Sequence, residues 1–513
     1  MMVVDRRALK DAFLFSPLLL LLLAPSAGAY VYHAGPSDYS GIVSNLQPGD
    51  VLELNPGTYE SGLSLYDMHG EPDNPITIRG PADGTPAVFH AHSCCNTVQL
   101  KDASYITIEH LTLDGQGLDG PFGVDSRGAS HHITVSHLRI VNYSGSQQTD
   151  GISTKGPAWG WVIKDNTIIG AGTGMYLGNS DGSAPFVAGI IEHNRILDTI
   201  GYNIEIKHQN ARPTGIGMPT GDSVTIIRHN VFSKDSGASP DGPRPNLLVG
   251  NFPDSGTGAN DLYEIYGNFF YQNPTESLFQ GEGNIALYDN LFVNDSGDAV
   301  RIQPHNDVPK RIEIFHNTVV AAGDGIHMYG GASGYVQRIE ANAVFAGTPV
   351  TGPNQAYNIT GTYGEASDYL NNPGGGIGAL DLFPRPGMLT GTAVPSDVYT
   401  GFDDSGTDFD GRARTGEFRG AYAAAGTNDG WQPSLGQAPG GEAGAAGGSG
   451  GSGGGSGSGG STGSGSGSGT GSAASSSQSG GGALGPAWLV LLALGATLRR
   501  AAIRRACRAA PCG

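Results

Sequence analysis

Ile163-Lys-Asp-Asn166-Thr-Ile168 is the first of seven segments in which one pattern recurs: an apolar residue, two variable residues, Asn, one variable residue and a second apolar residue. The first apolar residue is Ile or Leu, and the second is Ile, Phe or Val. The shared asparagines are Asn166, Asn194, Asn230, Asn268, Asn290, Asn317 and Asn342. A short unit that recurs every few tens of residues is typical of a solenoid, in which stacked rungs bury apolar faces that one rung alone cannot bury.

The rungs are predicted to be built from short strands. Alternating apolar residues mark strands at 76–78, 106–108 and 133–135, and no amphipathic stretch with a helical period recurs, which excludes a helical solenoid. Asn suits a sharp bend between strands, and Asn side chains stacked at a rung spacing of about 4.8 Å can bond to one another. Such a ladder resembles that of the right-handed parallel β-helix, an all-β fold, over about residues 50–350.

The domain spans residues 30–430 and is expected to carry a cap at each end, because a solenoid exposes its terminal rungs. A short helix over 36–46 is the predicted N-terminal cap. Residues 351–430 lack the repeat and are predicted to form the C-terminal cap. The stretch Asp408-Phe-Asp-Gly-Arg-Ala-Arg414 resembles the closing segment of carbohydrate-active β-helices, and its charged groups are predicted to make hydrogen bonds within the cap rather than to act in catalysis.

Both ends of the chain are predicted to lie outside this domain. Residues 1–29 have the basic start, apolar run and Ala-x-Ala site of a secretory signal peptide. Residues 431–482 form a Gly/Ser-rich linker that is expected to be disordered. The apolar segment 483–498 and the Arg-rich tail 499–513 follow, an order that resembles bacterial tripartite C-terminal sorting tails. The sequence therefore predicts an exported, surface-tethered monomer with a membrane or sorting anchor at its C-terminus.

Charge limits the partners of the folded part. The chain has a net charge of −19, and because the terminal segments carry about +1 and +5, the folded part carries about −25. Nucleic acid is therefore excluded as a partner, and a polyanionic glycan requires a local basic patch. Cys94 and Cys95 are adjacent and could form a disulfide or pack as free thiols.

A second set of strands follows the Asn rungs, and these strands are also predicted to align. Alternation places two outward columns on them. The first column is Ser153, Tyr176, Glu205, Leu248, Phe279, Arg301 and His327. The second column is Lys155, Gly178, Lys207, Gly250, Gly281, Gln303 and Tyr329. Two long connections, 209–222 and 236–260, flank this face, which is predicted to be a glycan-binding groove rather than a plain solvated sheet.

The residue types on this face fit β-elimination on an acidic polysaccharide. That reaction requires a cation to neutralise the uronate carboxylate, a base for the adjacent proton and an acid for the leaving oxygen. Lys207 is the predicted base, Arg212 or Arg301 the neutraliser, and His208 or Tyr176 the acid. Glu205 is predicted either to hold Ca²⁺, the only cofactor considered, or to pair with Lys207. The substrate-binding residues are predicted to be Tyr176, Glu205, Lys155, His305, His327 and Tyr329.

The arrangement resembles β-helix polysaccharide lyases of the chondroitinase B and alginate lyase type. Those families open with the kind of segment found at Pro48-Gly49-Asp50 and Gly57-Thr58-Tyr59, and they carry a catalytic Lys on one rung and an Arg on the next. Lys207 matches that Lys, whereas the next strand lacks the Arg and only Arg244 is near. A non-catalytic module that binds acidic or neutral polysaccharide, or serves adhesion, is therefore the alternative.

Two further patterns are interpreted as structural. Thr149-Asp-Gly-Ile152 resembles a polygalacturonase motif, but its partner carboxylates are absent, so Asp150 is predicted to be a turn residue. The residue before the bend is often His or Asp, which suggests turn residues that bond to the neighbouring rung rather than a metal site. These positions are His110, His137, Asp165, His193, His229, Asp289 and His316.

Overall fold

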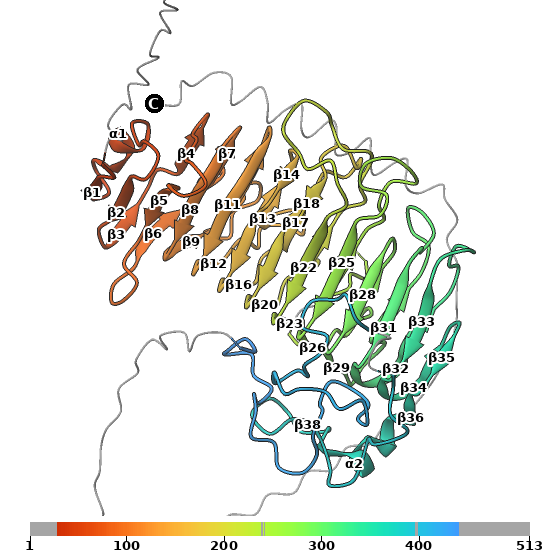
Figure 1. Ribbon diagram of the computed structural model, residues 1–513. Helices are drawn as coiled ribbons and strands as arrows, with labels where there is room; N and C mark the ends of the chain where they lie inside the picture. The colour runs from red at the N-terminus through yellow and green to blue at the C-terminus, as the bar shows by residue number, and fades with distance from the viewer. Residues whose placement is uncertain (1–27, 237–239, 241, 396–398, 441–513) are drawn as a thin grey trace, which may run out of the picture.

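The computed structural model describes residues 28–440 except 237–239, 241 and 396–398, and within them the chain forms an all-β, right-handed parallel β-helix (Figure 1). Every pairing between rungs is parallel and joins strands of successive rungs. The predicted fold class is therefore confirmed. Residues 1–27 of the predicted signal peptide, 441–482 of the predicted linker, the apolar segment and the Arg-rich tail lie outside the described residues. Residues 431–440, predicted to belong to the linker, are described, and Trp431 and Ala438 pack with the C-terminal segment, so the folded part extends further than predicted.

The first sheet contains the strands that precede the Asn bends. Its order follows the chain, one strand per rung, and the short strands β14 (Ala158–Trp159) and β18 (Phe186–Val187) pair at its side. The main strands are β1 (Val31–Ala34), β2 (Val51–Leu54), β5 (Ile76–Arg79), β8 (Ser104–Glu109), β11 (Ser130–Ser136), β15 (Val162–Lys164), β19 (Ile190–Glu192), β22 (Val224–Arg228), β25 (Leu262–Tyr266), β28 (Ile285–Tyr288), β31 (Ile312–Phe315), β33 (Gln337–Glu340) and β35 (Gln355–Ala356).

The second sheet contains the strands that follow the bends. Its strands are β3 (Gly57–Tyr59), β6 (Ala87–His90), β9 (Leu111–Asp114), β12 (Arg139–Val141), β16 (Thr167–Ile169), β20 (Arg195–Leu197), β23 (Val231–Ser233), β26 (Phe269–Tyr271), β29 (Leu291–Asn294), β32 (Thr318–Met328), β34 (Ala343–Thr351) and β36 (Ile359–Gly361).

The third sheet completes each rung and joins the second sheet through the long strands β32 and β34. Its other strands are β4 (Leu63–Tyr66), β7 (Val98–Lys101), β10 (Val124–Arg127), β13 (Asp150–Thr154), β17 (Thr173–Leu177), β21 (Ile204–Ile206), β24 (Leu247–Val249), β27 (Phe279–Gly281) and β30 (Val300–Ile302).

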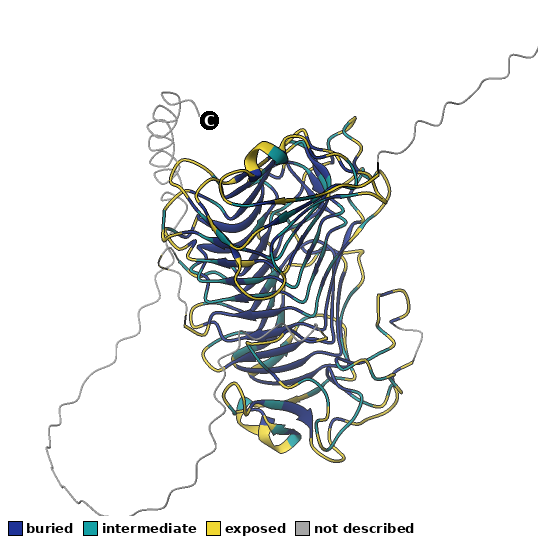
Figure 2. Cartoon of the chain, turned by 90° about the vertical axis from the view of Figure 1, so that its left-hand side faces the viewer, coloured by how far each residue is buried: buried dark blue, intermediate teal, exposed yellow. Residues whose placement is uncertain are grey.

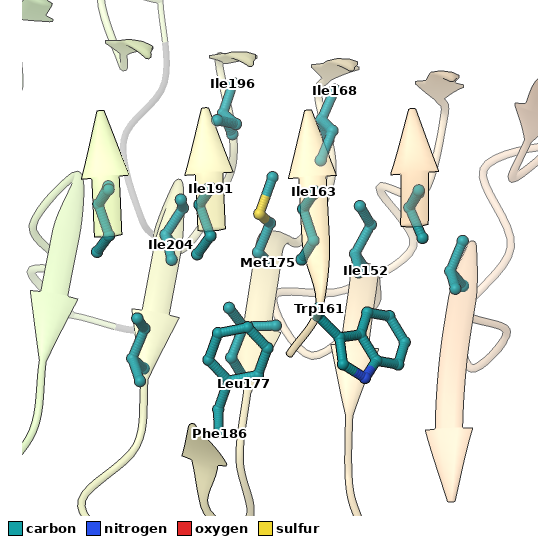
Figure 3. Packing of buried hydrophobic residues seen from close by; sticks show 14 of the residues in the cluster. Ile152, Trp161, Ile163, Ile168, Met175, Leu177, Phe186, Ile191, Ile196 and Ile204 are labelled. Carbon is teal, nitrogen blue, oxygen red and sulfur yellow. The ribbon is translucent and has the colours of Figure 1, made fainter. Parts of the chain in front are cut away.

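The apolar residues of the repeat form two continuous inward columns. Ile163 lies opposite Ile191, and Ile168 opposite Ile196, as the repeat predicted. Figure 3 shows these side chains between the sheets together with Met175 and Ile204 of the third sheet. Farther along, the second-sheet column becomes aromatic, with ring centres 4.5–4.7 Å apart in the run Phe232, Phe270 and Phe292. Buried residues therefore fill the length of the solenoid (Figure 2).

The asparagines form the predicted ladder along the bends. The Asn166 Nδ2 atom donates to the Asn194 Oδ1 atom at 2.9 Å, and the Asn194 backbone amide donates to the Asn230 Oδ1 atom at 2.9 Å. The same pattern continues beyond the repeat, because Asn342 donates to Asn358. One further rung, made by β35 and β36, therefore belongs to the solenoid although its sequence no longer matches the pattern.

The backbone bend itself is made by the residue before each Asn. Positive φ angles near 55° occur at His110, His137, Asp165, His193 and His229, whereas none of the ladder asparagines has a positive φ. The Asn side chain satisfies backbone groups around a bend that its neighbour makes. The positive φ angles, and backbone amides that bond to the next rung, confirm that these His and Asp residues serve the turn. Separately, among the described residues no group of three His, Cys, Asp or Glu side chains is placed to hold a metal ion.

The N-terminal cap is helix α1 (Tyr39–Val43), which is shorter than the predicted 36–46. Tyr39 and Val43 are buried, and the Tyr39 ring packs edge-on against Tyr59 and Phe89 at the end of the core. Nearby, Cys94 and Cys95 form a disulfide.

The C-terminal segment covers the side of the solenoid more than its end. It contains a 3₁₀ turn (Tyr363–Glu365), α2 (Ala366–Tyr369), β37 (Leu370–Asn372) and β38 (Asp381–Pro384). Its apolar residues pack on the outer face of the second sheet, which is unusually apolar there: Val231, Phe269, Leu291, Val320 and Phe345 are all buried. The predicted end cap is thus mainly a lateral cover. It shields from water the apolar side chains that point outward from β23, β26 and β29.

The charged groups of the Asp408–Arg414 stretch make hydrogen bonds within this cover, as predicted. The Asp408 carboxylate accepts from the backbone amides of Asp410, Arg412 and Ala423. Arg414 forms an ion pair with the buried Asp289. In the described part of the chain no helix is long and apolar enough to cross a bilayer.

We predict that Asn268→Ala destabilises the protein far more than Asn358→Ala. Asn268 is fully buried, its Nδ2 atom donates to the Ile227 and Tyr266 carbonyls, and its Oδ1 atom accepts from Asn230. The substitution leaves several buried groups unpaired and is expected to cost roughly 3 kcal/mol or more, against about 1 kcal/mol for the terminal, partly exposed Asn358. Urea unfolding of both variants tests this, and equal losses would contradict a structural role for the ladder.

We also predict a loss of stability below pH 6.5 that depends on His229. Burial, with His193 and Arg228 nearby, lowers the pKa of His229 to about 4, so the unfolded chain takes up a proton on this ring first. Stability therefore falls as the pH drops from 6.5 toward 4, by on the order of 2 kcal/mol for this group. His229→Asn keeps a residue type that tolerates positive φ, and its melting temperature is expected to depend less on pH. An unchanged pH profile would contradict the assignment.

Candidate functional site

The candidate groove lies on the outer face of the third sheet, and the strands align there almost as predicted. Backbone register places Ser153 beside Tyr176, Tyr176 beside Glu205, and Glu205 beside Leu248. Two positions on one strand are corrected. Gln280, not Phe279, lies beside Leu248, and the Phe279 side chain is fully buried in the core. Gly281 lies beside the inward Val249, so Glu282 and not Gly281 follows Gly250 in the second column. Leu278 and Phe279 are both apolar and buried, so alternation alone does not fix which residues of this strand point outward.

The Tyr176 ring is the centre of a compact charged cluster. The Lys155 Nζ atom lies 3.0 Å from the ring centre and the Lys207 Nζ atom 5.6 Å from it. The two ammonium groups are held from the side by carboxylates: Lys207 donates to the Glu205 Oε1 atom at 2.6 Å, and the Lys155 Nζ atom lies 3.2 Å from the Asp150 Oδ2 atom. Consecutive rungs thus place two ion pairs around one aromatic ring.

Burial separates the two kinds of charge in this cluster. The side chains of Asp150 and Glu205 are 3% and 7% exposed, whereas those of Lys155 and Lys207 are 16% and 18% exposed. The ammonium groups and the Tyr176 ring are thus more accessible than the carboxylates. A ligand on this face meets cations and an aromatic ring, which suits an anionic ligand with ring-shaped units.

The surroundings shift the protonation of the cluster. Burial lowers the pKa of Lys155, although Asp150 opposes that effect. Burial raises the pKa of Asp150 to about 6, with Lys155 acting in the opposite direction. Burial, with Glu205 and Asp150 nearby, raises the pKa of the Tyr176 phenol. The cluster therefore combines an amine that releases its proton more easily than usual with a phenol that keeps its proton.

Two buried glycines beside the lysines allow close approach of neighbouring chain. Gly178, with a φ of 96°, lies on the rung between those of Lys155 and Lys207, and Gly250 lies on the rung after Lys207. A Cβ atom on Gly250 would lie 2.3 Å from the His208 backbone nitrogen, so only glycine fits there. The sequence predicted open floor at these glycines, and this is wrong: both are buried, and the backbone of the neighbouring rung or connection fills the space beside them.

Arg212 is not part of the groove, which corrects its assignment as a neutraliser. Its side chain is buried, forms an ion pair with Asp261 and donates to the carbonyl of Gly221 at 3.0 Å. These bonds close the long 209–222 connection on itself. His208, next to Lys207, is partly buried, and burial together with Lys207 lowers its pKa.

Arg301, His327, Tyr329 and His305 form a separate group toward the C-terminal end. Arg301 lies three rung spacings from Glu205, or roughly 14 Å at about 4.8 Å per spacing, so Arg301 cannot neutralise a carboxylate held by Lys207. Arg301 pairs with Asp298, and the His327 Nδ1 atom lies 3.0 Å from Asp324. Tyr329 donates to Gln303, and the His305 backbone amide donates to Glu282.

Three charged residues of this face were not predicted from the sequence: Asp150, Asp125 and Arg127. Asp150 begins strand β13 and is buried beside Lys155, so it is not merely a turn residue. One rung earlier, Asp125 is fully buried and accepts from the Arg127 Nε atom at 2.7 Å. Strand β10 was not predicted because Val124-Asp-Ser-Arg127 contains a single apolar residue. The strand becomes evident only from its register with β13.

Calcium does not fit this cluster. Asp150 and Glu205 each already contact an ammonium group, and the part of the chain that the structure describes contains no group of three metal-ligating side chains. We therefore derive no chemical step through a metal ion.

A comparison with family models agrees with the fold. A family model described as a right handed beta helix region matches residues 150–340. Similar solved structures include an alginate lyase from Paenibacillus sp. str. FPU-7, with 14% identity over 65% of this chain and 98% of that chain and a TM-score of 0.34. The PL6 family alginate lyase AlyGC has 13% identity over 64% of this chain and 51% of its own, with a TM-score of 0.39.

A GH136 lacto-N-biosidase from Eubacterium ramulus is similar at 12% identity, over 65% of this chain and 68% of that chain, with a TM-score of 0.34. No curated protein matches the chain. The substrates named for these enzymes are their own, and the match of the family model to the central rungs agrees with the right-handed parallel β-helix.

Proposed function

We propose that the protein is an exported, surface-tethered carbohydrate-active β-helix protein that cleaves an acidic polysaccharide by β-elimination. The observation that carries this proposal is the placement of two ammonium groups, Lys155 and Lys207, beside the ring of Tyr176, with side chains that are mostly buried but keep 16% and 18% of their surface exposed. Export and tethering rest on the signal peptide and the C-terminal segments of the sequence. A protein whose folded part is acidic needs a local basic patch to bind a polyanionic ligand. The ammonium groups of Lys155 and Lys207 supply positive charge for such a patch at this site.

The geometry favours different roles for the two lysines. Lys207, held by Glu205 at 2.6 Å, is suited to neutralise the uronate carboxylate, which acidifies the adjacent C–H bond. Lys155 has the lowered pKa and is suited to take that proton. The electron pair then forms a carbon–carbon double bond as the bond to the leaving oxygen breaks. Tyr176, whose phenol stays protonated, is suited to give its proton to that oxygen.

The alternative is a glycan-binding or adhesion module without catalysis. Lys155 and Lys207 both lie in ion pairs, and the same cations and ring would bind an acidic chain without cleaving it. The two functions differ in one product, because only elimination creates an unsaturated sugar end.

We predict that the purified protein releases unsaturated ends from at least one of alginate, polygalacturonate and chondroitin sulfate, detected by ultraviolet absorbance. Lys155→Ala and Lys207→Ala are each expected to lower kcat at least about 100-fold, the size of a lost general-base or charge-stabilising group. Lys164→Ala, on the first sheet, is the matched control and is expected to keep full activity.

The binding alternative predicts another result in the same experiment. A polysaccharide that binds the wild type but yields no unsaturated product, with binding lost in Lys207→Ala, would replace the lyase proposal by the binding module. Full activity in both lysine variants would place the chemistry elsewhere.

We further predict that the affinity for an acidic oligosaccharide increases as the pH falls through about 6. Asp150, with a pKa of about 6, takes up a proton and loses its negative charge over that range, so the net charge of the cluster becomes more positive. Uronate carboxylates remain ionised there. Calorimetric titration between pH 7.5 and about 5 is expected to reveal this step in the wild type and not in Asp150→Asn. A step that persists in Asp150→Asn would assign it to another group.

A further inference from the structure

Cations continue along the third sheet on the N-terminal side of the candidate site. Arg127 lies in register with Lys101, and the Lys155 backbone amide bonds to the Ser126 carbonyl, which places Lys155 on the rung after Arg127. The Lys207 amide bonds to the Leu177 carbonyl, which places Lys207 after Gly178. We call this outward column, Lys101, Arg127, Lys155 and Lys207, the cation ladder.

The ladder becomes more exposed toward its N-terminal end. The Arg127 side chain is 49% exposed and pairs with the fully buried Asp125, and Lys101 is exposed. Among the described residues no carboxylate lies in ion-pair distance of the Lys101 side chain. The carboxylates of this face, Asp125, Asp150 and Glu205, are buried beneath the cations, so the outer surface of the column is positive although the folded part as a whole is acidic.

An aromatic residue and a cavity lie at the end of the ladder. Tyr66 is in register with Lys101, one rung closer to the N-terminus, and is 52% exposed. Beyond it, a cavity of about 690 Å³ opens between α1 and β4, lined by Tyr66, Ser64, Ser40, Ser44 and Gln47 among others. Polar side chains and an exposed ring are the groups that bind sugar hydroxyls and ring faces.

The column changes character on the other side of Lys207. The next positions are Gly250 and Glu282, and the Glu282 carboxylate is buried and accepts from the backbone amides of His305, Asn306 and Asp307. The next cation, Arg301, lies three rungs away in the neighbouring column and is paired with Asp298. The positive surface is therefore one-sided: it starts at Lys207 and runs toward α1.

We propose that an acidic polysaccharide binds along the axis of the solenoid on the N-terminal side of the candidate site, over Arg127, Lys101 and Tyr66, with its far end at the cavity beside α1. The identity of the ligand as an acidic polysaccharide rests on the proposed function. Lys207 and Tyr66 are five rung spacings apart, or roughly 24 Å, a length that accommodates several sugar units of an extended chain. Charge complementarity selects the occupant, and Lys101 and Tyr66 are positioning residues remote from the chemistry.

The test compares long and short acidic chains on variants outside the catalytic cluster. Lys101→Gln and Tyr66→Ala are each expected to weaken binding of the long chain about threefold to tenfold and to raise its KM with kcat unchanged, as the loss of one exposed contact implies. A disaccharide or trisaccharide, too short to reach Lys101 from Lys207, is expected to bind all variants equally. Lys164→Gln and Tyr335→Ala, a tyrosine 49% exposed, are the matched controls.

Salt provides a second readout that a folding defect would not mimic. Affinity of the wild type for the long chain is expected to fall as sodium chloride increases, and the fall is expected to be smaller in Lys101→Gln because one screened contact has been removed. Binding is measured by calorimetry with alginate, polygalacturonate and chondroitin sulfate, and cleavage by the absorbance of unsaturated ends.

The outcomes separate this inference from the proposed function. Cleavage with the same KM in every variant, for long and short chains alike, would overturn the ladder and leave the lyase. Binding without cleavage that weakens in Lys101→Gln and Tyr66→Ala would support the ladder and overturn the lyase. A protein that binds none of the three polysaccharides would overturn both.

Discussion

Parallel, in-register stacking of successive rungs is the constraint on which every other feature of this protein depends. Backbone hydrogen bonds between strands set the spacing, and the buried Asn ladder fixes the bend of each rung to the next through both side-chain and backbone groups. Because an isolated rung has no core, a residue keeps its place only if the rungs on both sides of it are in register. Side chains far apart in sequence are therefore brought into straight columns with a separation that the backbone determines.

Such columns explain how a groove arises without a pocket of the usual kind. Asp150 with Lys155, Tyr176, and Glu205 with Lys207 come from three consecutive rungs, and each contributes one or two groups that alone would be ordinary surface charges. Stacking places two ammonium groups beside one ring, and glycine at 178 and 250 lets the neighbouring chain approach closely beside the lysines. The site is linear because the scaffold is linear, which suits a polymer better than a small molecule.

The repeat made the fold and most of the columns predictable, and its failures have physical reasons. The inward positions of Ile163 and Ile168 follow from a period that the core enforces. Strand β10 was missed because its Asp125 and Ser126 are buried polar residues, and burial of that kind depends on Arg127 and on neighbouring rungs rather than on local sequence. Phe279 was misplaced because two adjacent apolar residues left the alternation ambiguous. Arg212 was misassigned because its partner, Asp261, lies on the next rung, beyond the long 236–260 connection.

Exposure distinguishes ion pairs that hold the structure from those that face a ligand. Arg212 with Asp261, and Arg414 with Asp289, are at most 6% exposed on both sides, and each ties a connection or the C-terminal cover to the solenoid. In the pairs Lys155–Asp150 and Lys207–Glu205 the carboxylate side chains are 3% and 7% exposed, whereas the side chains of the two cations are 16% and 18% exposed. A pair that served stability alone would gain nothing from this asymmetry, because exposed charges contribute little. An asymmetry repeated on several rungs, with the same sign outward each time, indicates a surface that presents positive charge to a partner, even though the molecule as a whole is acidic.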